Sequence, residues 1–460
     1  MRWYRGAPPG IFREQVRCLI PHTSNLTPRI KSLIELKSPQ ERAILVGAPI
    51  KRSNARHHTA EHLDELERLA DTAGAVVVGT LTQQLDRPDP ATYIGKGKVE
   101  ELKAMIAEKE ATVVIFDDEL SPAQGKNLEG DLLKRVIDRA ELILDIFAVR
   151  ARSAEARMQV ELAQLEYSLP RLVRMWTHLE KFRGGIGVRG PGETQLETDR
   201  RLVGHRIRLL KERLTDVTKA REVQRAGRTG AFRAALVGYT NAGKSSILRG
   251  MSGAKEIFVE DRLFATLDPL TREVDLGEHQ SVLLTDTVGF IRKLPHHLVA
   301  SFRATLEEVR EADLLLHVID ASHPTWEEQR LVVDDVLADL GVHDLPMVYV
   351  FNKMDALPAD QHEALRARIE NLAPGSVFVS ALTSEALEPL RDSLRASLRA
   401  RRPEIELLVP LTHGKLLADV HRLGESVTTM PDEDEGVMRV RGRFDVADLA
   451  RLEKDGAARA

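Results

Sequence analysis

Residues 238–245 read Gly-Tyr-Thr-Asn-Ala-Gly-Lys-Ser, and this stretch decides the fold of the chain. Its pattern is that of a phosphate-binding loop, which connects a strand to a helix. The apolar residues 234–237 predict a short buried strand before it, and residues 245–251 suit a helix after it. In that setting backbone N–H groups surround phosphate oxygens, Lys244 reaches the β- and γ-phosphates, and the Ser245 hydroxyl ligates Mg²⁺. An ordinary glycine-rich turn is the alternative, which the strand–loop–helix context disfavours.

Residues 352–355, Asn-Lys-Met-Asp, indicate which base is bound, because they follow a second apolar stretch at 347–351. At the end of a strand there, the Asp355 carboxylate can accept hydrogen bonds from N1–H and the exocyclic amine of guanine. Adenine offers neither group, so a desolvated carboxylate rejects it. Asn352 can bridge the base and the phosphate-binding loop, and the aliphatic stem of Lys353 can cover the ring. The tetrapeptide also suits a helix cap or a turn, but its place after a strand favours guanine.

A third apolar strand runs into the sequence Thr-Asp-Thr-Val-Gly, which ends at Gly289. Asp286 is placed to hold Mg²⁺ through water, and the Gly289 N–H to bond the γ-phosphate. Ras-like enzymes place a glutamine that orients the attacking water at the next position, where this chain has Phe290. A phenyl ring cannot make that bond, so we expect slow hydrolysis that another residue, a cation or a partner completes. Arg292 and Arg303 are nearby candidates, although an ordinary surface arginine is favoured at each position.

Two further motifs complete the pattern. Residues 263–269, Leu-Phe-Ala-Thr-Leu-Asp-Pro, offer Thr266 as the switch threonine that ligates Mg²⁺ only when the γ-phosphate is present, and Thr271 is its rival. Residues 377–382, Val-Phe-Val-Ser-Ala-Leu, predict a strand after which the Ala381 N–H meets the guanine carbonyl oxygen.

These motifs, in this order and each at a strand end, predict an α/β fold with a Ras-like P-loop GTPase domain over residues 229–400, binding GTP and GDP at the carboxyl edge of its sheet. Asn241 is a second candidate cation site, because asparagine here can bind potassium beside the phosphates, or only fix the shape of the loop. Lys244, Thr266 and Gly289 are the candidate catalytic residues. The residues expected to contact nucleotide or metal are Gly238, Tyr239, Thr240, Asn241, Ala242, Gly243, Lys244, Ser245, Ser246, Phe264, Ala265, Thr266, Leu267, Asp268, Asp286, Thr287, Val288, Gly289, Asn352, Lys353, Met354, Asp355, Ser380, Ala381 and Leu382.

The composition sets bounds on the rest of the chain. Its 460 residues predict about three or four domains, and a hydrophobic share of 43% suffices for their cores. A lone cysteine, Cys18, favours a reducing compartment, and no apolar run approaches the length of a membrane span. We expect a cytoplasmic monomer without stable membrane insertion, with partial membrane association left open. Residues 1–40, which hold five prolines and no signal-peptide pattern, predict a flexible extension.

Residues 41–150 alternate strand-like and helix-like stretches and predict a small α/β domain with a parallel sheet. The expected strands and helices cover residues 43–46, 62–73, 75–79, 99–109 and 112–116. Within this domain, residues 93–98, Tyr-Ile-Gly-Lys-Gly-Lys, could touch an anion, but an ordinary loop is favoured. Residues 117–119, Asp-Asp-Glu, could ligate a cation, but a capped turn before Pro122 is favoured. At the other end of the chain, residues 401–460 predict a small α/β appendage with strands near 405–409 and 436–440.

Residues 151–228 predict a long antiparallel helical hairpin, because apolar residues recur at heptad spacing in two stretches. The repeats are Met158, Leu162, Leu165, Leu169 and Leu172, then Val203, Ile207, Leu210, Leu214 and Val217. Pro170 is expected to kink the first helix. The connection at 182–192 is rich in glycine and carries Arg183 and Arg189, which suits contact with phosphates of RNA. From Arg171 to Arg225, fourteen basic and seven acidic residues also suggest a polyanionic partner, although on charge alone a solvated helical face is favoured.

Over residues 41–450 the chain resembles the HflX family of ribosome-associated GTPases, which belong to the translation-factor-related class. The resemblance rests on the motifs at 238–245, 263–269, 286–290 and 352–355, and above all on Gly-Gly-Ile-Gly-Val-Arg-Gly-Pro-Gly-Glu-Thr-Gln-Leu-Glu at 184–197. It favours Thr266 over Thr271, and the family shares the aromatic residue at Phe290.

The resemblance implies a Mg²⁺-dependent GTPase that binds the large ribosomal subunit and its RNA, reaches the peptidyl-transferase region with the hairpin tip, and splits or rescues stalled ribosomes. It also implies that the ribosome stimulates hydrolysis. Some family members bind adenine nucleotides through the N-terminal domain, and RNA unwinding is attributed to a few. Two alternatives remain on the residues alone: a GTP-regulated signalling switch without an RNA partner, and an RNA-remodelling protein.

Overall fold

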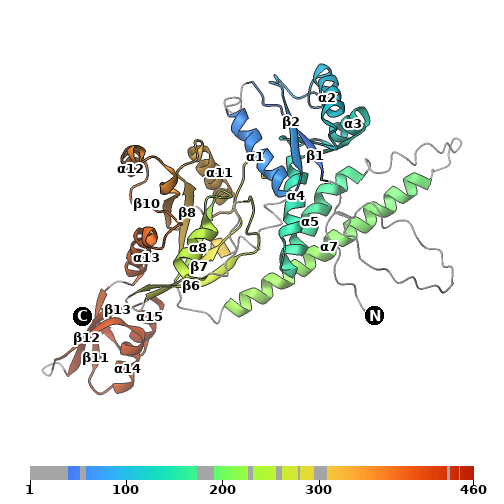
Figure 1. Cartoon of the computed structure of the whole chain (residues 1–460). Helices are drawn as coiled ribbons and strands as arrows, with labels where there is room; N and C mark the ends of the chain where they lie inside the picture. Colours follow the sequence, from blue (N-terminus) through green and yellow to red (C-terminus); the bar gives the residue numbers. More distant parts are fainter. Residues whose placement is uncertain are drawn as a thin grey trace, which may run out of the picture. The chain divides into compact units, whose positions relative to one another are not determined.

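The computed structural model describes residues 40–51, 58–172, 191–225, 232–254, 262–277, 280–294, 308–342, 344–402, 404–432, 436–444 and 446–460. Contacts divide the chain into two units (Figure 1). The first comprises Met1–Glu212 and Lys293–Ser301, and the second comprises Arg213–Arg292 and Phe302–Ala460. The expected flexible extension, and Arg183 and Arg189 of the hairpin tip, lie outside the described residues.

The first unit contains a four-stranded, fully parallel sheet in the order β2-β1-β3-β4. Its strands are β1 (Arg42–Gly47), β2 (Val76–Thr82), β3 (Val113–Phe116) and β4 (Arg135–Asp138). Helices α1 (Thr59–Thr72) and α4 (Arg139–Arg150) contact each other, as do α2 (Lys96–Lys109) and α3 (Pro122–Leu132). The parallel sheet predicted for residues 41–150 is therefore confirmed, and β4 is an additional strand. The capped turn before Pro122 is also present, since Ser121 and Gln124 form a capping box.

The two heptad stretches form helices α5 (Ala154–Ser168) and α7 (Pro191–Arg225). The first changes to a 3-10 turn at Leu169–Arg171, because Pro170 has no N–H to continue the α-helical ladder. Ion pairs link the helices, with Arg206 Nε lying 2.6 Å from Glu161 Oε1 and Lys211 Nζ lying 2.7 Å from Glu166 Oε1. The turn of the predicted hairpin lies beyond the described part of the chain.

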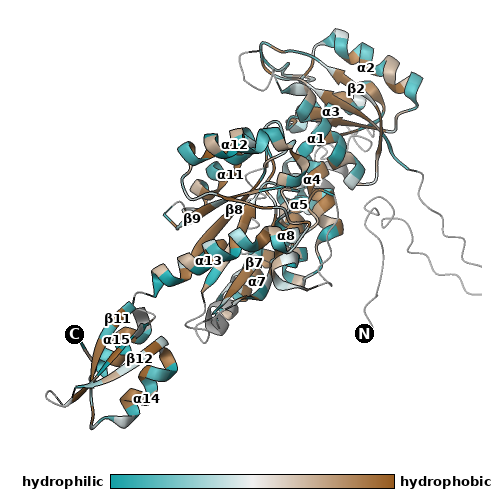
Figure 2. Ribbon diagram, turned by 60° about the vertical axis from the view of Figure 1, so that its left-hand side comes forward, coloured by the Kyte–Doolittle hydropathy of each residue, from teal (hydrophilic) through white to brown (hydrophobic). Residues whose placement is uncertain are grey.

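The second unit contains a six-stranded sheet in the order β10-β9-β8-β5-β7-β6, in which β6 alone pairs antiparallel. The strands are β5 (Arg233–Gly238), β6 (Leu270–Gly277), β7 (Gln280–Asp286), β8 (Leu314–Asp320), β9 (Met347–Asn352) and β10 (Val377–Phe378). Helices α8 (Lys244–Ser252) and α13 (Glu388–Arg401) share one core with the sheet. Helices α11 (Trp326–Asp339) and α12 (Ala359–Leu372) share another. Figure 2 shows the apolar character of the central strand β8, which suits its burial between these layers.

The C-terminal residues form a β-α-β-β-α-β arrangement of the ferredoxin-like type. The elements are β11 (Glu404–Pro410), α14 (Gly414–Leu423), β12 (Glu425–Asp432), β13 (Val437–Arg443), α15 (Val446–Lys454) and β14 (Ala458–Arg459). The sheet is antiparallel in the order β12-β13-β11-β14. This confirms an α/β appendage with strands near both predicted positions, and adds two strands to it.

Candidate nucleotide site

The phosphate-binding loop joins β5 to α8, and its two fixed glycines are required by close approaches. Gly238 has φ 150°, and a Cβ there would lie 2.2 Å from the carbonyl oxygen of Val318 on β8. Gly243 has φ 97°, and a Cβ there would lie 2.1 Å from Asn352 Nδ2. Any side chain at either position would therefore collide with backbone or with the base-recognition motif.

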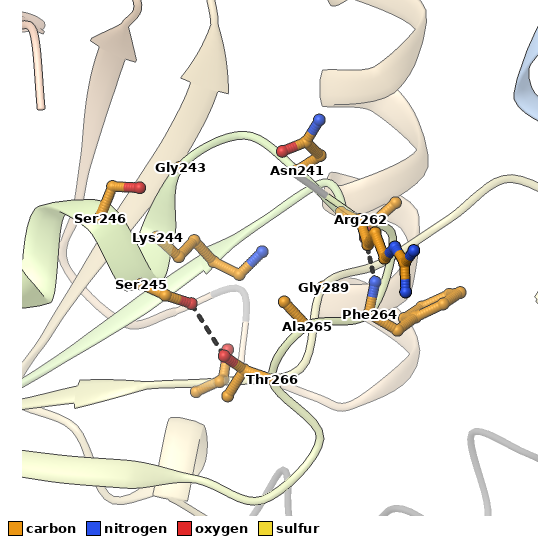
Figure 3. A pocket seen from close by; sticks show the side chains of 12 residues that line it. Asn241, Gly243, Lys244, Ser245, Ser246, Arg262, Phe264, Ala265, Thr266 and Gly289 are labelled. Carbon is orange, nitrogen blue, oxygen red and sulfur yellow. Dashed lines mark hydrogen bonds between the residues drawn. The ribbon is translucent and has the colours of Figure 1, made fainter. Parts of the chain in front are cut away.

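Lys244 begins helix α8 and is buried, with its side chain directed into the pocket (Figure 3). Its Nζ donates to the carbonyl oxygens of Gly238 at 3.1 Å and Tyr239 at 2.9 Å. Burial lowers the pKa of Lys244 to about 8, and the nearby Asp286 opposes that shift. The ammonium thus lies inside the loop, ready for anionic oxygens that would stabilise its charge.

Three oxygen-bearing side chains converge beside Lys244 and form a suitable Mg²⁺ site. Ser245 Oγ lies 2.8 Å from Thr266 Oγ1 (Figure 3). It also donates to Asp286 Oδ2 at 2.6 Å. Burial raises the pKa of Asp286, while Lys244 and the hydrogen bond from Ser245 lower it. Asp286 Oδ1 is buried without a hydrogen-bond partner among the described residues. Hydroxyl and carboxylate oxygens are the ligands that Mg²⁺ prefers, so the donor set fits the metal.

The structure separates the two candidate switch threonines. Thr266 reaches Ser245, whereas Thr271 lies on β6 with its Oγ1 2.9 Å from Thr285 Oγ1. Of the two, only Thr266 lies beside Ser245, and its role as metal ligand stays a prediction.

The segment after β7 runs along the phosphate-binding loop. The Phe290 N–H donates to Gly238 O at 3.1 Å, and Phe290 O accepts from the Thr240 N–H at 2.7 Å. The Phe290 side chain is 1% exposed and is not among the groups that line the pocket. A Cβ on Gly289 would lie 2.6 Å from Thr240 Cα, so the segment passes the loop in close contact. The main-chain N–H of Arg292 donates to the Tyr239 hydroxyl at 2.8 Å. The other candidate, Arg303, lies outside the described residues.

The base-recognition side is built around Asn352 at the end of β9. Asn352 Nδ2 donates to Ala242 O at 2.9 Å, and Asn352 Oδ1 accepts from the Ala381 N–H at 3.1 Å. The expected bridge from Asn352 to the loop is therefore present, while the Ala381 N–H bonds to Asn352 rather than pointing freely to a base. Ser380 Oγ donates to the exposed Asp355 carboxylate. Lys353 has φ 62°, and its Nζ lies 2.7 Å from Asp320 Oδ2 at the end of β8.

The pocket at the loop contains most of the predicted phosphate and metal residues. Leu267 and Val288, also predicted as contacts, are instead buried apolar side chains, and Leu382 is exposed. Sequence reasoning missed Arg262, and its only signal was its position directly before the switch motif. The lining residues are Thr240, Asn241, Gly243, Lys244, Ser245, Ser246, Arg262, Phe264, Ala265, Thr266, Thr287 and Gly289.

A strand–loop–helix phosphate cradle, a hydroxyl and carboxylate metal site, and an Asn-Lys-x-Asp motif at neighbouring strand ends define a Ras-like P-loop GTPase. Three family models match consecutive regions of the chain. They are "GTP-binding GTPase N-terminal" at 60–148, "GTP-binding GTPase Middle Region" at 150–228, and "50S ribosome-binding GTPase" at 233–353. GTPase HflX of Lacrimispora saccharolytica is 46% identical over 87% of this chain and 93% of its own length. GTPase HflX of Escherichia coli K12 is 43% identical over 86% and 93%. The chain belongs to the HflX family of GTPases, and it binds and hydrolyses GTP.

A solved GTP-binding protein from the archaeon Sulfolobus solfataricus, in complex with GDP, is 24% identical and covers 78% of this chain. The match covers 98% of that protein at a TM-score of 0.42.

Among the described residues, no helix has both the length and the apolar character needed to cross a membrane.

Proposed function

We propose that this GTPase binds the large ribosomal subunit in its GTP state and splits or rescues stalled ribosomes. The observation that carries the proposal is the match of residues 233–353 to a 50S ribosome-binding GTPase model, within a chain of HflX type. The ribosome would stimulate hydrolysis by completing the site that Phe290 leaves without a water-orienting side chain.

Helix α7 supports an RNA partner through its charge. Several basic side chains on this helix are exposed and could contact RNA phosphates without uncovering a hydrophobic core: Arg200, Arg201, Arg208 and Arg213. Phosphate contacts of this kind give affinity that falls steeply with salt and carries little base specificity. The predicted contacts of Arg183 and Arg189 with RNA phosphates would add to the salt-dependent affinity.

Within the nucleotide site, each residue has a proposed task. Mg²⁺ would supply positive charge to the β- and γ-phosphates. Lys244 would neutralise the same phosphates, Gly289 would donate its N–H to the γ-phosphate, and Asp355 would select guanine. Potassium at Asn241 is a further proposal, and turnover that is equal in potassium and sodium buffers would refute it.

Co-sedimentation with purified large subunits tests the ribosome proposal. We expect binding with a non-hydrolysable GTP analogue, weak binding with GDP, and none with Lys244→Ala. Arg200→Ala/Arg208→Ala should reduce the salt slope by about one per lost phosphate contact and leave GTP affinity unchanged. Lys109→Ala, which changes an exposed lysine on α2, is the control. Absence of binding at low and moderate salt would favour the signalling switch. RNA remodelling that survives Lys244→Ala would favour the third alternative.

Splitting needs a separate measurement. Light scattering of intact ribosomes should fall when the protein and GTP are added, and should stay constant with Arg183→Ala/Arg189→Ala. Binding without any fall would refute splitting and leave the ribosome partner in place.

A further inference from the structure

Two adjacent side chains of the phosphate-binding loop each hold one of the two switch segments. Thr240 Oγ1 accepts a hydrogen bond from the Phe264 N–H at 3.0 Å. The Tyr239 hydroxyl accepts one from the Arg292 N–H at 2.8 Å. Both side chains are buried, at 7% and 6% exposed, so neither bond competes freely with water. Phosphate binding by this loop depends on main-chain N–H groups and Lys244, and therefore does not account for either hydroxyl.

We propose that the Tyr239 and Thr240 hydroxyls are positioning groups for GTP hydrolysis, which hold the segments that carry Gly289 and Thr266 in register with the phosphate-binding loop. The inference rests on the hydrolytic activity of the family and does not depend on the ribosome as partner.

The Thr240 bond stabilises a conformation that the sequence alone disfavours. Phe264 has φ 55°, in the left-handed region that bulky side chains rarely adopt, and its side chain is 2% exposed. Such a conformation persists only when its surroundings hold it. Two residues later Thr266 reaches Ser245 at 2.8 Å. The Thr240 hydroxyl thus fixes the turn that delivers the metal-binding threonine.

The Tyr239 bond holds the other segment at its far end. Phe290 already pairs with the main chain of Gly238 and Thr240, and the Arg292 N–H adds a third point of attachment. Gly289 lies between Asp286 and these attachments, against Thr240. Its N–H, which binds the γ-phosphate in this class, is therefore fixed before reaction rather than ordered during it.

Deleting each hydroxyl while keeping the shape of the side chain tests the proposal on the full chain. We expect Tyr239→Phe and Thr240→Val each to lower the single-turnover rate of GTP hydrolysis about fivefold, the effect of one neutral hydrogen bond. GDP affinity should stay within about twofold, because GDP does not engage the γ-phosphate contacts. Thr240→Ser keeps the hydroxyl and should restore the rate.

Two variants of the first unit are matched controls for the loss of a buried hydroxyl. The Tyr167 hydroxyl donates to Asp138 Oδ1 at 2.8 Å, and Thr92 Oγ1 donates to Ile94 O at 2.8 Å. Tyr167→Phe and Thr92→Val should lower the melting temperature to a similar extent and leave hydrolysis unchanged. GDP binding by the loop variants shows that they are folded. An unchanged or faster rate in Tyr239→Phe and Thr240→Val, or a Thr240→Ser variant as slow as Thr240→Val, would overturn the proposal.

Discussion

The hydroxyl oxygens of Ser245 and Thr266 lie 2.8 Å apart, although 21 residues separate them in the chain. Asp286 joins them from the end of β7, so three separate segments bring one oxygen-bearing side chain each to a single point. A metal ion bound at that point would therefore also fix the position of the switch segment.

This geometry predicts different outcomes for the two threonines. Thr266→Val should weaken binding of a Mg²⁺-bound GTP analogue at least about tenfold, the scale of one charge-assisted contact, with little effect on GDP. Thr271→Val should only destabilise the fold, by about 1 kcal/mol, because it removes the bond to Thr285. Titration of each variant with a fluorescent GTP analogue and Mg²⁺ measures the affinity, and urea denaturation measures the stability. If Thr271→Val alone lost affinity for the analogue, our assignment would be reversed.

Gly289→Ala should separate binding from hydrolysis. The new Cβ would lie 2.6 Å from Thr240 Cα and 3.0 Å from Lys244 Nζ, so the segment must move away from the loop. We expect hydrolysis to fall about a hundredfold while GDP affinity changes little, because overpacking of this kind typically costs about 1–3 kcal/mol and displaces the N–H from the γ-phosphate. Gly204→Ala on α7, where a Cβ meets nothing within 4 Å, is the control. Normal turnover in Gly289→Ala would show that this N–H is dispensable.

Asp355→Asn should exchange the base that is preferred. The carboxylate accepts two donors from guanine, whereas an asparagine amide offers one acceptor and one donor, which suits the 2-carbonyl of xanthine. We expect a loss of about a hundredfold in GTP affinity and a gain for xanthosine triphosphate. Competition binding with the two nucleotides measures the change, and Asp360→Asn, an exposed carboxylate on α12, is the control. Equal loss for both nucleotides would mean that Asp355 supports the fold rather than reading the base.

The pKa of Lys244, lowered to about 8 by burial, predicts a pH-dependent affinity. Bound phosphates favour the charged ammonium, so binding takes up a proton above pH 8. The dissociation constant for GDP should be flat below about pH 8 and rise by up to about tenfold per pH unit above it. Calorimetry in two buffers of different ionisation enthalpy measures the proton uptake, and a constant affinity from pH 7 to 9 would contradict the burial of the charge.

The same pKa has a consequence for the protein without nucleotide. The unfolded chain keeps the lysine protonated up to its ordinary value of 10.5. Between about pH 8 and 10.5 the unfolded state therefore binds more protons than the folded state, and this group makes the free energy of unfolding rise with pH. Urea denaturation across that window should show the increase, and saturating GDP should abolish it.

The motifs at 238–245, 285–289 and 352–355 could be located from the sequence, because each follows an apolar strand and needs no distant partner to be recognised. Strand β8 was not predicted, although Leu314–Asp320 is apolar, because it carries no motif that would distinguish it from a buried helix. The hydroxyls of Tyr239 and Thr240 could not be assigned either. Their partners lie 53 and 24 residues away and are main-chain groups, which leave no trace in residue type.

That main-chain character also constrains how the family can vary. Main-chain N–H groups donate both hydrogen bonds, so these two contacts do not restrict the residue type at positions 264 and 292. Proline is the exception, because it has no N–H. An alignment of homologues would therefore show these two hydrogen bonds as hydroxyl-bearing residues at 239 and 240. At positions 264 and 292 it would show only that proline is absent.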